Sequence, residues 1–185
     1  MFTIDKKFGK YANPEVERKF LLRGVPSSAT FHSEITDLYV KDSTLRLRKA
    51  ETKGGTRYKL AQKIRPNPQD TRMILHTNIY LSESEYDLVT SLPSNKLQKT
   101  RHSFKAGNVP VGVDQFHGAL DGLVVLEVDF GANGNPDGFA SPSIALAEVT
   151  DDERFTGATL ATTTRATLIE VLDEVADLKL PPSDK

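Results

Sequence analysis

The chain contains no cysteine, and this absence removes several kinds of chemistry. Without thiols there are no disulfides, no thiolate metal sites and no cysteine nucleophile. No stretch of the sequence approaches the roughly 20 consecutive apolar residues that a membrane-spanning helix needs. Charges at Asp5, Lys6 and Lys7 interrupt any apolar run of the kind found in a signal peptide. These absences predict a cytoplasmic protein that has no membrane partner.

The chain also lacks an excess of charge of either sign. Its 24 Lys and Arg residues stand against 25 Asp and Glu residues, and its pI is about 6.4. Such a balance provides no overall field that would attract nucleic acid or a membrane surface. A length of 185 residues with 38% hydrophobic content is enough for one domain with its own core. We expect residues 1–13 to be a flexible extension and residues 14–180 to form a single domain.

Most of the sequence consists of short segments in which polar and apolar residues alternate. This period of two is typical of β-strands, because successive side chains point to opposite faces. Turn residues such as Lys53-Gly54-Gly55 and Gly107-Asn108 separate the segments. The expected strands are Glu15–Leu22, Thr36–Val40, Thr44–Ala50, Arg57–Ile64, Arg72–Leu81, Gln98–Phe104, Val109–Phe116 and Leu123–Phe130.

Helical patterns interrupt this series once and then follow it. Ser82 and Glu85 form a capping box that predicts a helix over Ser82–Leu92. Two further helices are expected over Ser141–Val149 and Thr162–Leu178. Many strands in hairpin order predict an α+β fold that is predominantly β, an antiparallel barrel or sandwich with helices packed outside.

The expected strands share a charged face. Glu15, Glu17 and Lys19 project from one face of the first strand, which continues into the apolar run Phe20–Leu22. The matching faces of later strands carry Arg46, Arg48, Lys59, Lys63, Lys99, Arg101, Asp114, Glu127 and Asp129. A solvated outer surface is the ordinary interpretation of any one such face. Apolar residues on the opposite faces, which outer helices would cover, instead favour a barrel with a charged interior.

A charged interior must stay hydrated or bind a ligand, since buried charges without partners cost several kcal/mol each. Clustered Arg and Lys side chains favour phosphate groups. Clustered carboxylates favour Mg²⁺ or Mn²⁺, which bind oxygen ligands and bridge to phosphates. The combination predicts a site for a complex of a divalent metal with a polyphosphate.

The segment Glu15-Val16-Glu17-Arg18-Lys19 resembles the ExExK signature of the CYTH superfamily, the triphosphate tunnel metalloenzymes. Leu45–Arg48, Tyr58–Lys63, Lys99–Arg101 and Gly122–Phe130 resemble later strands of that family, in the same order. The resemblance implies an eight-stranded antiparallel barrel that forms a tunnel and binds triphosphate inside. Its members include inorganic, thiamine and RNA triphosphatases and class IV adenylate cyclases.

The resemblance also implies roles for individual residues. The implied metal ligands, for Mg²⁺ or Mn²⁺, are Glu15, Glu17, Glu127, Asp129 and Asp114. The implied substrate-binding residues are Lys19, Arg46, Arg48, Lys59, Lys63, Arg72, Lys99 and Arg101. Lys19, Glu17 and Glu127 are the implied catalytic residues, and the partner is a small molecule that contains a triphosphate.

One strand departs from the family pattern. Ile74, His76 and Asn78 stand where many members carry inward glutamates, and Gly112 stands where an acid is common. His76 is a candidate metal ligand or base, although an isolated strand histidine is more often a hydrogen-bonded structural residue. These departures bear on whether the chain turns its ligand over.

The main hypothesis is a metal-dependent hydrolase that cleaves inorganic, thiamine or nucleoside triphosphate. A class IV adenylate cyclase is one alternative, but the sequence shows no base for a ribose hydroxyl and no adenine pocket. A non-catalytic protein that binds polyphosphate or a phosphorylated metabolite is another. No nucleic acid other than a nucleotide is expected to bind. The preferred triphosphate, the number of metal ions and the oligomeric state, a homodimer among the possibilities, stay open.

Overall fold

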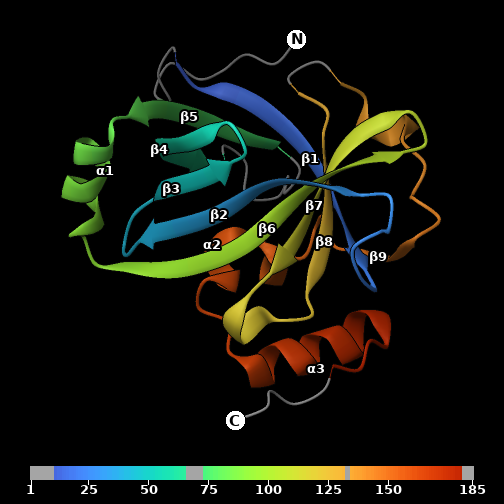
Figure 1. The fold of residues 1–185 in the computed structure, drawn as a ribbon. Coiled ribbons are helices and arrows are strands. Elements are labelled where there is room, and N and C mark those ends of the chain that lie inside the picture. The colour runs from blue at the N-terminus through green and yellow to red at the C-terminus, as the bar shows by residue number, and fades with distance from the viewer. Residues whose placement is uncertain (1–10, 66–72, 132–133, 181–185) are drawn as a thin grey trace.

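The computed structural model describes residues 11–65, 73–131 and 134–180. Eight antiparallel strands form a closed barrel in the order β1-β5-β4-β3-β2-β6-β7-β8 and back to β1 (Figure 1). The strands are β1 (Asn13–Leu22), β2 (Thr30–Val40), β3 (Leu45–Thr52), β4 (Gly55–Ile64), β5 (Met73–Leu81), β6 (Ser94–Ala106), β7 (Val109–Phe116) and β8 (Val124–Asp129). The predicted fold class is therefore confirmed, and the barrel alternative holds over the sandwich.

Strand β1 closes the barrel because it has a partner on each side. Its first residues pair with β5, where Asn13 lies opposite His76. Its remaining residues pair with β8, where Glu17 lies opposite Asp129. A ninth strand, β9 (Ala145–Glu148), pairs with the last residues of β1. Closure satisfies the strand edges and sets the register of the ExExK segment against its neighbours.

Helices lie outside the barrel wall and across one end of it. Helix α1 (Glu83–Thr90) packs over β3, β4 and β5, and the predicted capping box of Ser82 and Glu85 is present. Helix α2 (Gly157–Leu160) and helix α3 (Arg165–Ala176) follow β9 in the chain. Short 3-10 turns are η2 (Gly118–Leu120), η3 (Pro136–Gly138) and η4 (Glu153–Phe155). Among the described residues, no helix is long and apolar enough to cross a bilayer.

The helix predicted over Ser141–Val149 is wrong, because this segment contains strand β9 instead. Arg18 projects away from the barrel interior and donates to Glu148 of β9 at 2.8 and 2.6 Å. Strand β5 pairs only with the first residues of β1, which leaves the edge of its last residues free for β9. This pairing and the two hydrogen bonds from Arg18 hold the segment in an extended form. Tertiary pairing therefore overrides the local preference of a short apolar run.

Several element boundaries also differ from those predicted. Strand β2 begins at Thr30 and β6 at Ser94, and the two pair along their whole common length, which extends both beyond their alternating segments. The predicted extension overlaps the fold, because Asn13 is part of β1 and Ala12 is buried. Helix α2 had no counterpart among the predicted helices. Helix α3 is shorter than predicted, and Thr164 caps it.

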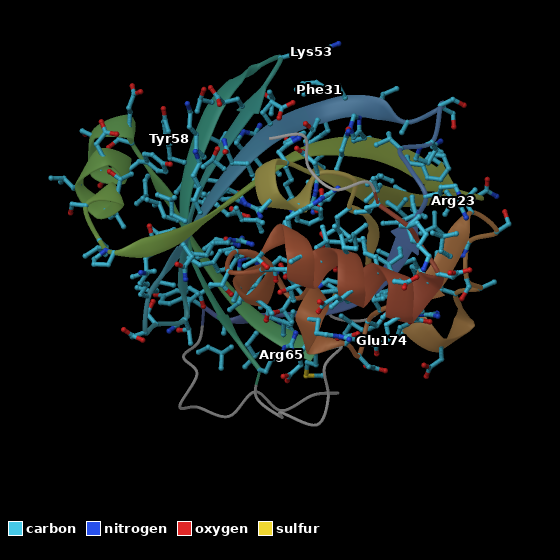
Figure 2. The ribbon with its side chains drawn as sticks, turned by 90° about the horizontal axis from the view of Figure 1, so that it is seen from below. Arg23, Phe31, Lys53, Tyr58, Arg65 and Glu174 are labelled. Atoms are coloured by element: carbon cyan, nitrogen blue, oxygen red, sulfur yellow. The ribbon has the colours of Figure 1, made fainter. Side chains whose placement is uncertain are left out.

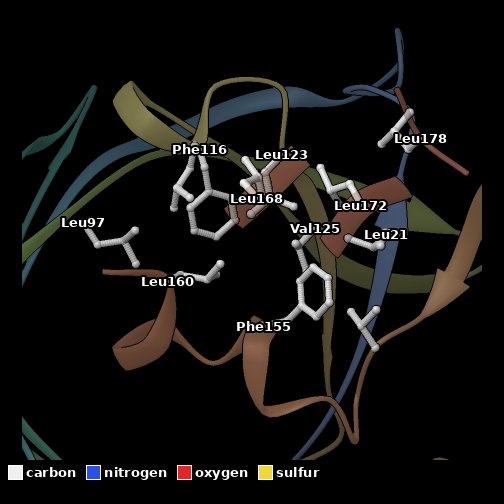
Figure 3. Packing of buried hydrophobic residues seen from close by; sticks show 12 residues of the cluster. Leu21, Leu97, Phe116, Leu123, Val125, Phe155, Leu160, Leu168, Leu172 and Leu178 are labelled. Atoms are coloured by element: carbon white, nitrogen blue, oxygen red, sulfur yellow. The ribbon is translucent and has the colours of Figure 1, made fainter. Parts of the chain in front are cut away.

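The main hydrophobic core fills one end of the barrel. Leu21, Leu97, Phe116 and Val125 belong to the strands, and α3 contributes Leu168 and Leu172 (Figure 3). Burying each of these side chains contributes about 1.5–3 kcal/mol. We call this the apolar end. Helix α3 lies across the barrel in Figure 2, where Lys53 marks one end of the β3–β4 pair and Arg65 the other.

The opposite end carries the β3–β4 turn at Lys53-Gly54 and the β6–β7 turn at Gly107-Asn108. We call it the hairpin end. A second cluster lies on the outer face and includes Phe20, Val113 and Leu126, packed against Phe130 and Phe139. The outer apolar face is thus covered in part by the segment after β8, and not by helices alone.

Candidate functional site

The charged faces of the strands meet around a cavity of about 750 Å³ inside the barrel. Cavities of this size commonly hold small-molecule ligands. The predicted site residues that line it are Glu15, Glu17, Lys19, Arg46, Arg48, Lys59, Lys63, Lys99, Arg101, Glu127 and Asp129. Asp114 lies behind this lining and is fully buried. Arg72 lies outside the described residues.

Three residues of the ExExK segment point into the cavity and meet a lysine from β4. The Lys63 ammonium lies 3.2 Å from a carboxylate oxygen of Glu15 and 3.2 Å from one of Glu17. The Lys19 ammonium lies 3.5 Å from the other oxygen of Glu17. The strand registers of β1, β5 and β4 bring these groups together, although Lys63 follows Glu15 by 48 residues.

His76 lies beside Glu15, at one of the positions where many CYTH members carry an inward glutamate. Its Nδ1 lies 2.5 Å from Glu15 Oε1, and its side chain is 8% exposed. Burial raises the pKa of the Glu15 carboxyl, but the His76 hydrogen bond and the charge of Lys63 outweigh it and lower the pKa to about 2. Among the described residues, His76 Nε2 has no hydrogen-bond partner. The hydrogen bond with His76 thus helps to keep Glu15 in its charged form, because hydrogen bonding to a carboxylate favours that form.

A second charged network joins β6, β7 and β8. Arg101 donates from Nε and a terminal nitrogen to the two oxygens of Asp114, each at 2.6 Å. The same terminal nitrogen also donates to Glu127, and Lys99 donates to Asp114. Both oxygens of Asp114 are therefore occupied by cationic donors, so a metal-ligand role would require it to release them.

The electrostatics of this network follow from its burial. Burial lowers the pKa of Lys99 more than the charge of Asp114 raises it. Burial alone would raise the pKa of Glu127, yet the charges of Lys99 and Arg101 hold it well below its ordinary value. Burial would lower the pKa of Arg101, but Asp114 and Glu127 raise it well above the usual range. Glu127 is therefore a carboxylate, and not a carboxylic acid, at neutral pH.

Asp37 on β2 is a site residue that the sequence analysis missed. It is 1% exposed and accepts two hydrogen bonds from Arg48, each 2.6 Å long, while Arg46 Nε lies 3.7 Å away. Burial raises the pKa of Asp37, but the charges of Arg48 and Arg46 outweigh it and lower the pKa to about 2. The alternation of Asp37 and Tyr39 with Leu38 and Val40 was the signal that could have found it.

Arg46 and Lys59 are less neutralised than the other cations. Among the described residues, Arg46 Nε has no hydrogen-bond partner. Burial lowers the pKa of Lys59, and the neighbouring charges of Arg48 and Arg46 lower it further. Three cations around the single carboxylate of Asp37 leave a local excess of positive charge. Such a cluster favours an anion with several oxygens, such as a phosphate chain.

Tyr39 lies between this cluster and the apolar end. Burial raises its pKa to about 12, so its hydroxyl remains neutral. The hydroxyl packs directly against Gly157 at the start of α2, and a Cβ at that position would overlap it. Tyr39 also lines the cavity together with Phe155 and Leu160. The apolar end therefore closes the cavity mainly with uncharged side chains, although Glu153 also lines it.

The carboxylates that face the cavity could supply only some of the ligands of a metal ion. In the described parts of the chain, no three acidic or histidine side chains lie close enough to hold a metal on their own. Mg²⁺ is usually held by only one or two carboxylates, with substrate phosphates and waters as the other ligands. Glu15 and Glu17 are neighbours on one strand, and Asp129 lies opposite Glu17. This oxygen donor set fits Mg²⁺ or Mn²⁺ that arrives with phosphate, provided that Lys63 moves off the two glutamates.

No family model and no curated protein matches the sequence. Among solved structures, the inorganic triphosphatase NE1496 is 25% identical, with a TM-score of 0.56, over 80% of this chain and 95% of that chain. Another structure of NE1496, described as a hypothetical protein, is 24% identical with the same TM-score, over 81% and 99%. The PH1819 protein from Pyrococcus horikoshii is 19% identical with a TM-score of 0.46, over 62% and 76%.

The NE1496 likeness extends over most of both chains. In this chain, the ExExK strand and the basic strands that follow it in family order face one another across the interior of that barrel. The structural likeness to a triphosphatase and the closed eight-stranded barrel agree with the resemblance to the CYTH superfamily, the triphosphate tunnel metalloenzymes.

Proposed function

We propose that the protein hydrolyses a triphosphate substrate bound inside the barrel, with the help of a divalent metal ion. The observation that carries this proposal is that cationic side chains and carboxylates line the same cavity. Incompletely neutralised cations, Arg46 and Lys59, lie on one wall, and the carboxylates of Glu15 and Glu17 lie on another. The structural likeness to the inorganic triphosphatase NE1496 supports the same reaction class.

The cations divide into groups with different tasks. Arg46, whose Nε has no hydrogen-bond partner among the described residues, and Lys59 would bind phosphate oxygens first. Lys63 and Lys19 lie beside carboxylates and would exchange these for phosphate when the substrate enters. Arg48 donates to Asp37 and Arg101 donates to Asp114, so the orientation of both guanidinium groups is fixed. We assign Asp37 and Asp114 to positioning, because each accepts donors from a cation that lines the cavity.

Glu15, Glu17 and the opposing Asp129 and Glu127 are the residues that would hold Mg²⁺ or Mn²⁺. When bound, such an ion polarises phosphoryl oxygens, offsets their developing charge and acidifies a bound water. The chain itself supplies no covalent nucleophile. Lys19 and the fixed arginines would hold the transferred phosphoryl group in line and stabilise its charge, which are the main contributions of protein groups to phosphoryl transfer.

The test is phosphate release from inorganic triphosphate, thiamine triphosphate and ATP, with Mg²⁺, Mn²⁺ or a chelator. We expect metal-dependent release that falls at least about 100-fold in Glu17→Gln, as is typical when a group that stabilises the transition state is lost. The matched control is Glu51→Gln on β3, whose half-exposed carboxylate pairs with Lys49 outside the cavity. Equal release with metal and with chelator would rule the proposal out.

Binding without turnover is the second candidate function. It is favoured by β5, where Ile74 and His76 occupy inward positions beside Glu15 in place of acids. In that case the protein would bind triphosphate tightly, with no release of phosphate. The variant His76→Glu would then gain measurable hydrolysis, whereas it would lose hydrolysis if the native site is active through the His76–Glu15 pair.

A further inference from the structure

Strand β5 carries an exposed tyrosine, Tyr80, beside Lys59, a lysine that lines the cavity. His76, Asn78 and Tyr80 lie opposite Lys63, Ala61 and Lys59 of β4, respectively. Directly opposed residues of an antiparallel pair share a face of the sheet. Because Lys63 and Lys59 line the cavity, the three residues of β5 share the inward face of the barrel.

Exposure increases along this face towards the hairpin end. His76 is 6% exposed, whereas Tyr80 is 71% exposed. The Lys59 ammonium lies 5.9 Å from the centre of the Tyr80 ring. The tyrosine ring therefore lies beside one of the proposed phosphate-binding residues, with most of its surface open to a ligand.

We propose that Tyr80 binds the flat heterocycle of an organic triphosphate, so that the substrate is a triphosphate ester with an aromatic ring. This inference rests on the proposed function, since it names the substrate class of that same site. A nucleobase and the rings of thiamine share the chemistry that Tyr80 would recognise. An inorganic triphosphate has no group that could use this side chain.

The spacing along β5 suits such a ligand. Tyr80 follows His76 by four residues, which places it roughly 13 Å further along a strand that rises about 3.3 Å per residue. Of the proposed phosphate-binding cations, Lys63 lies at the level of His76 and Lys59 at the level of Tyr80. A heterocycle joined to the triphosphate through a sugar or a short linker would reach the tyrosine, while the phosphates lie deeper.

Asn78 lies between the two levels on the same face and is exposed. Its amide can both donate and accept hydrogen bonds, as a sugar hydroxyl or a linker oxygen requires. An aromatic side chain can stack on any flat heterocycle, because every such ring has a π face. The strand that lacks the inward glutamates thus presents an amide and an aromatic ring in sequence towards solvent.

The experiment compares four substrates: ATP, thiamine triphosphate, inorganic triphosphate and methyl triphosphate, which is an ester without a ring. Replacing Tyr80→Ala is expected to raise KM for the ring-bearing substrate roughly tenfold, the usual effect of losing one stacking partner. Its kcat is expected to stay unchanged, as are the constants for the two substrates without a ring. Tyr80→Phe should retain the native KM, because it keeps the ring.

The chain offers a matched control on the same strand. Ile79 is 55% exposed and lies opposite Leu60 on the outer face, so Ile79→Ala removes a similar exposed apolar surface without touching the cavity. Its KM values should equal those of the native protein. The arms with ATP and thiamine triphosphate separate a nucleobase from thiamine by the kcat/KM of the native protein, because Tyr80→Ala should raise KM for either ring.

Failure of the inference can be told from failure of the proposed function. If all four substrates are hydrolysed and Tyr80→Ala changes no KM, the aromatic subsite is refuted and hydrolysis stands. If none is hydrolysed, the proposed reaction is wrong, and calorimetric binding of the β,γ-methylene analogue of ATP and of thiamine triphosphate decides the subsite. A fall of five-fold or more in the affinity of either analogue in Tyr80→Ala supports it, and unchanged affinity for both overturns it.

Discussion

The substitution Asp37→Asn tests whether the positions of the cavity arginines depend on one buried carboxylate. Asp37 is 1% exposed, and both of its carboxylate oxygens accept hydrogen bonds from Arg48. Arg46 Nε lies 3.7 Å from Asp37 Oδ1. Asparagine has nearly the same shape but no charge. It would leave the buried guanidinium of Arg48 without its counterion and with one acceptor fewer.

Two estimates give the size of the effect. Lowering the Asp37 pKa from its ordinary 3.8 to about 2 corresponds to about 2.5 kcal/mol in favour of the charged form. Removing one member of a buried ion pair usually costs about 3–5 kcal/mol. We therefore expect Asp37→Asn to lower the free energy of unfolding by about 3 kcal/mol at pH 7. In a chain of this length that corresponds to a fall in Tm of about 6–12 °C.

Urea unfolding at several pH values provides the assay. The folded pKa of Asp37 is depressed, so its contribution is fully present above the unfolded pKa near 4 and is lost as the pH falls towards 2. The difference between the native protein and Asp37→Asn should therefore shrink over that window. Glu51→Gln, which changes a half-exposed carboxylate on β3, should stay within about 0.5 kcal/mol of the native protein at every pH.

Two results would refute this reasoning. One is a loss of less than about 1 kcal/mol at pH 7, which would mean that the ion pair contributes no more than an exposed one. The other is a loss of stability that is as large at pH 2 as at pH 7, which would point to packing instead of charge.

Two further predictions concern the inner end of the cavity. Gly157→Ala should lower the free energy of unfolding by about 1–3 kcal/mol, because the new Cβ would overlap the Tyr39 hydroxyl. Thermal melting of the double variant with Tyr39→Phe should recover part of this loss, and no recovery would show that the contact is not the cause. Arg46→Gln should weaken the binding of triphosphate at least about tenfold, since it removes an incompletely neutralised cation. Calorimetry with inorganic triphosphate measures this change, and an unchanged affinity would exclude Arg46 from the phosphate site.

Much of the cavity lining followed from periodicity. Alternation alone placed Glu15, Glu17 and Lys19 on one face, and the order of the later basic strands pointed to a barrel with a charged interior. The structure bears out this arrangement, and the residues do line one cavity. Local signals were also reliable where the interaction is local, as in the capping box of Ser82 and Glu85.

Contacts between strands that are distant in the sequence could not be predicted from periodicity. Which carboxylate pairs with which cation depends on strand register, and register is set by closure of the whole barrel. Asp37 lies opposite Arg48, and Lys63 reaches both Glu15 and Glu17, only because of that register. The sequence therefore predicted phosphate binding by Arg48 and Lys63 but not their carboxylate partners in the structure.

The sequence by itself determined the period-two pattern, the ordered charged motifs and hence the class of fold, because each depends on neighbouring residues along one strand. Only the tertiary structure decided that Ala145–Glu148 is a strand, that Asp37 holds the arginines and that α3 lies across an apolar end. The physical reason is that these features come from edges, registers and surfaces that exist only once the barrel has closed.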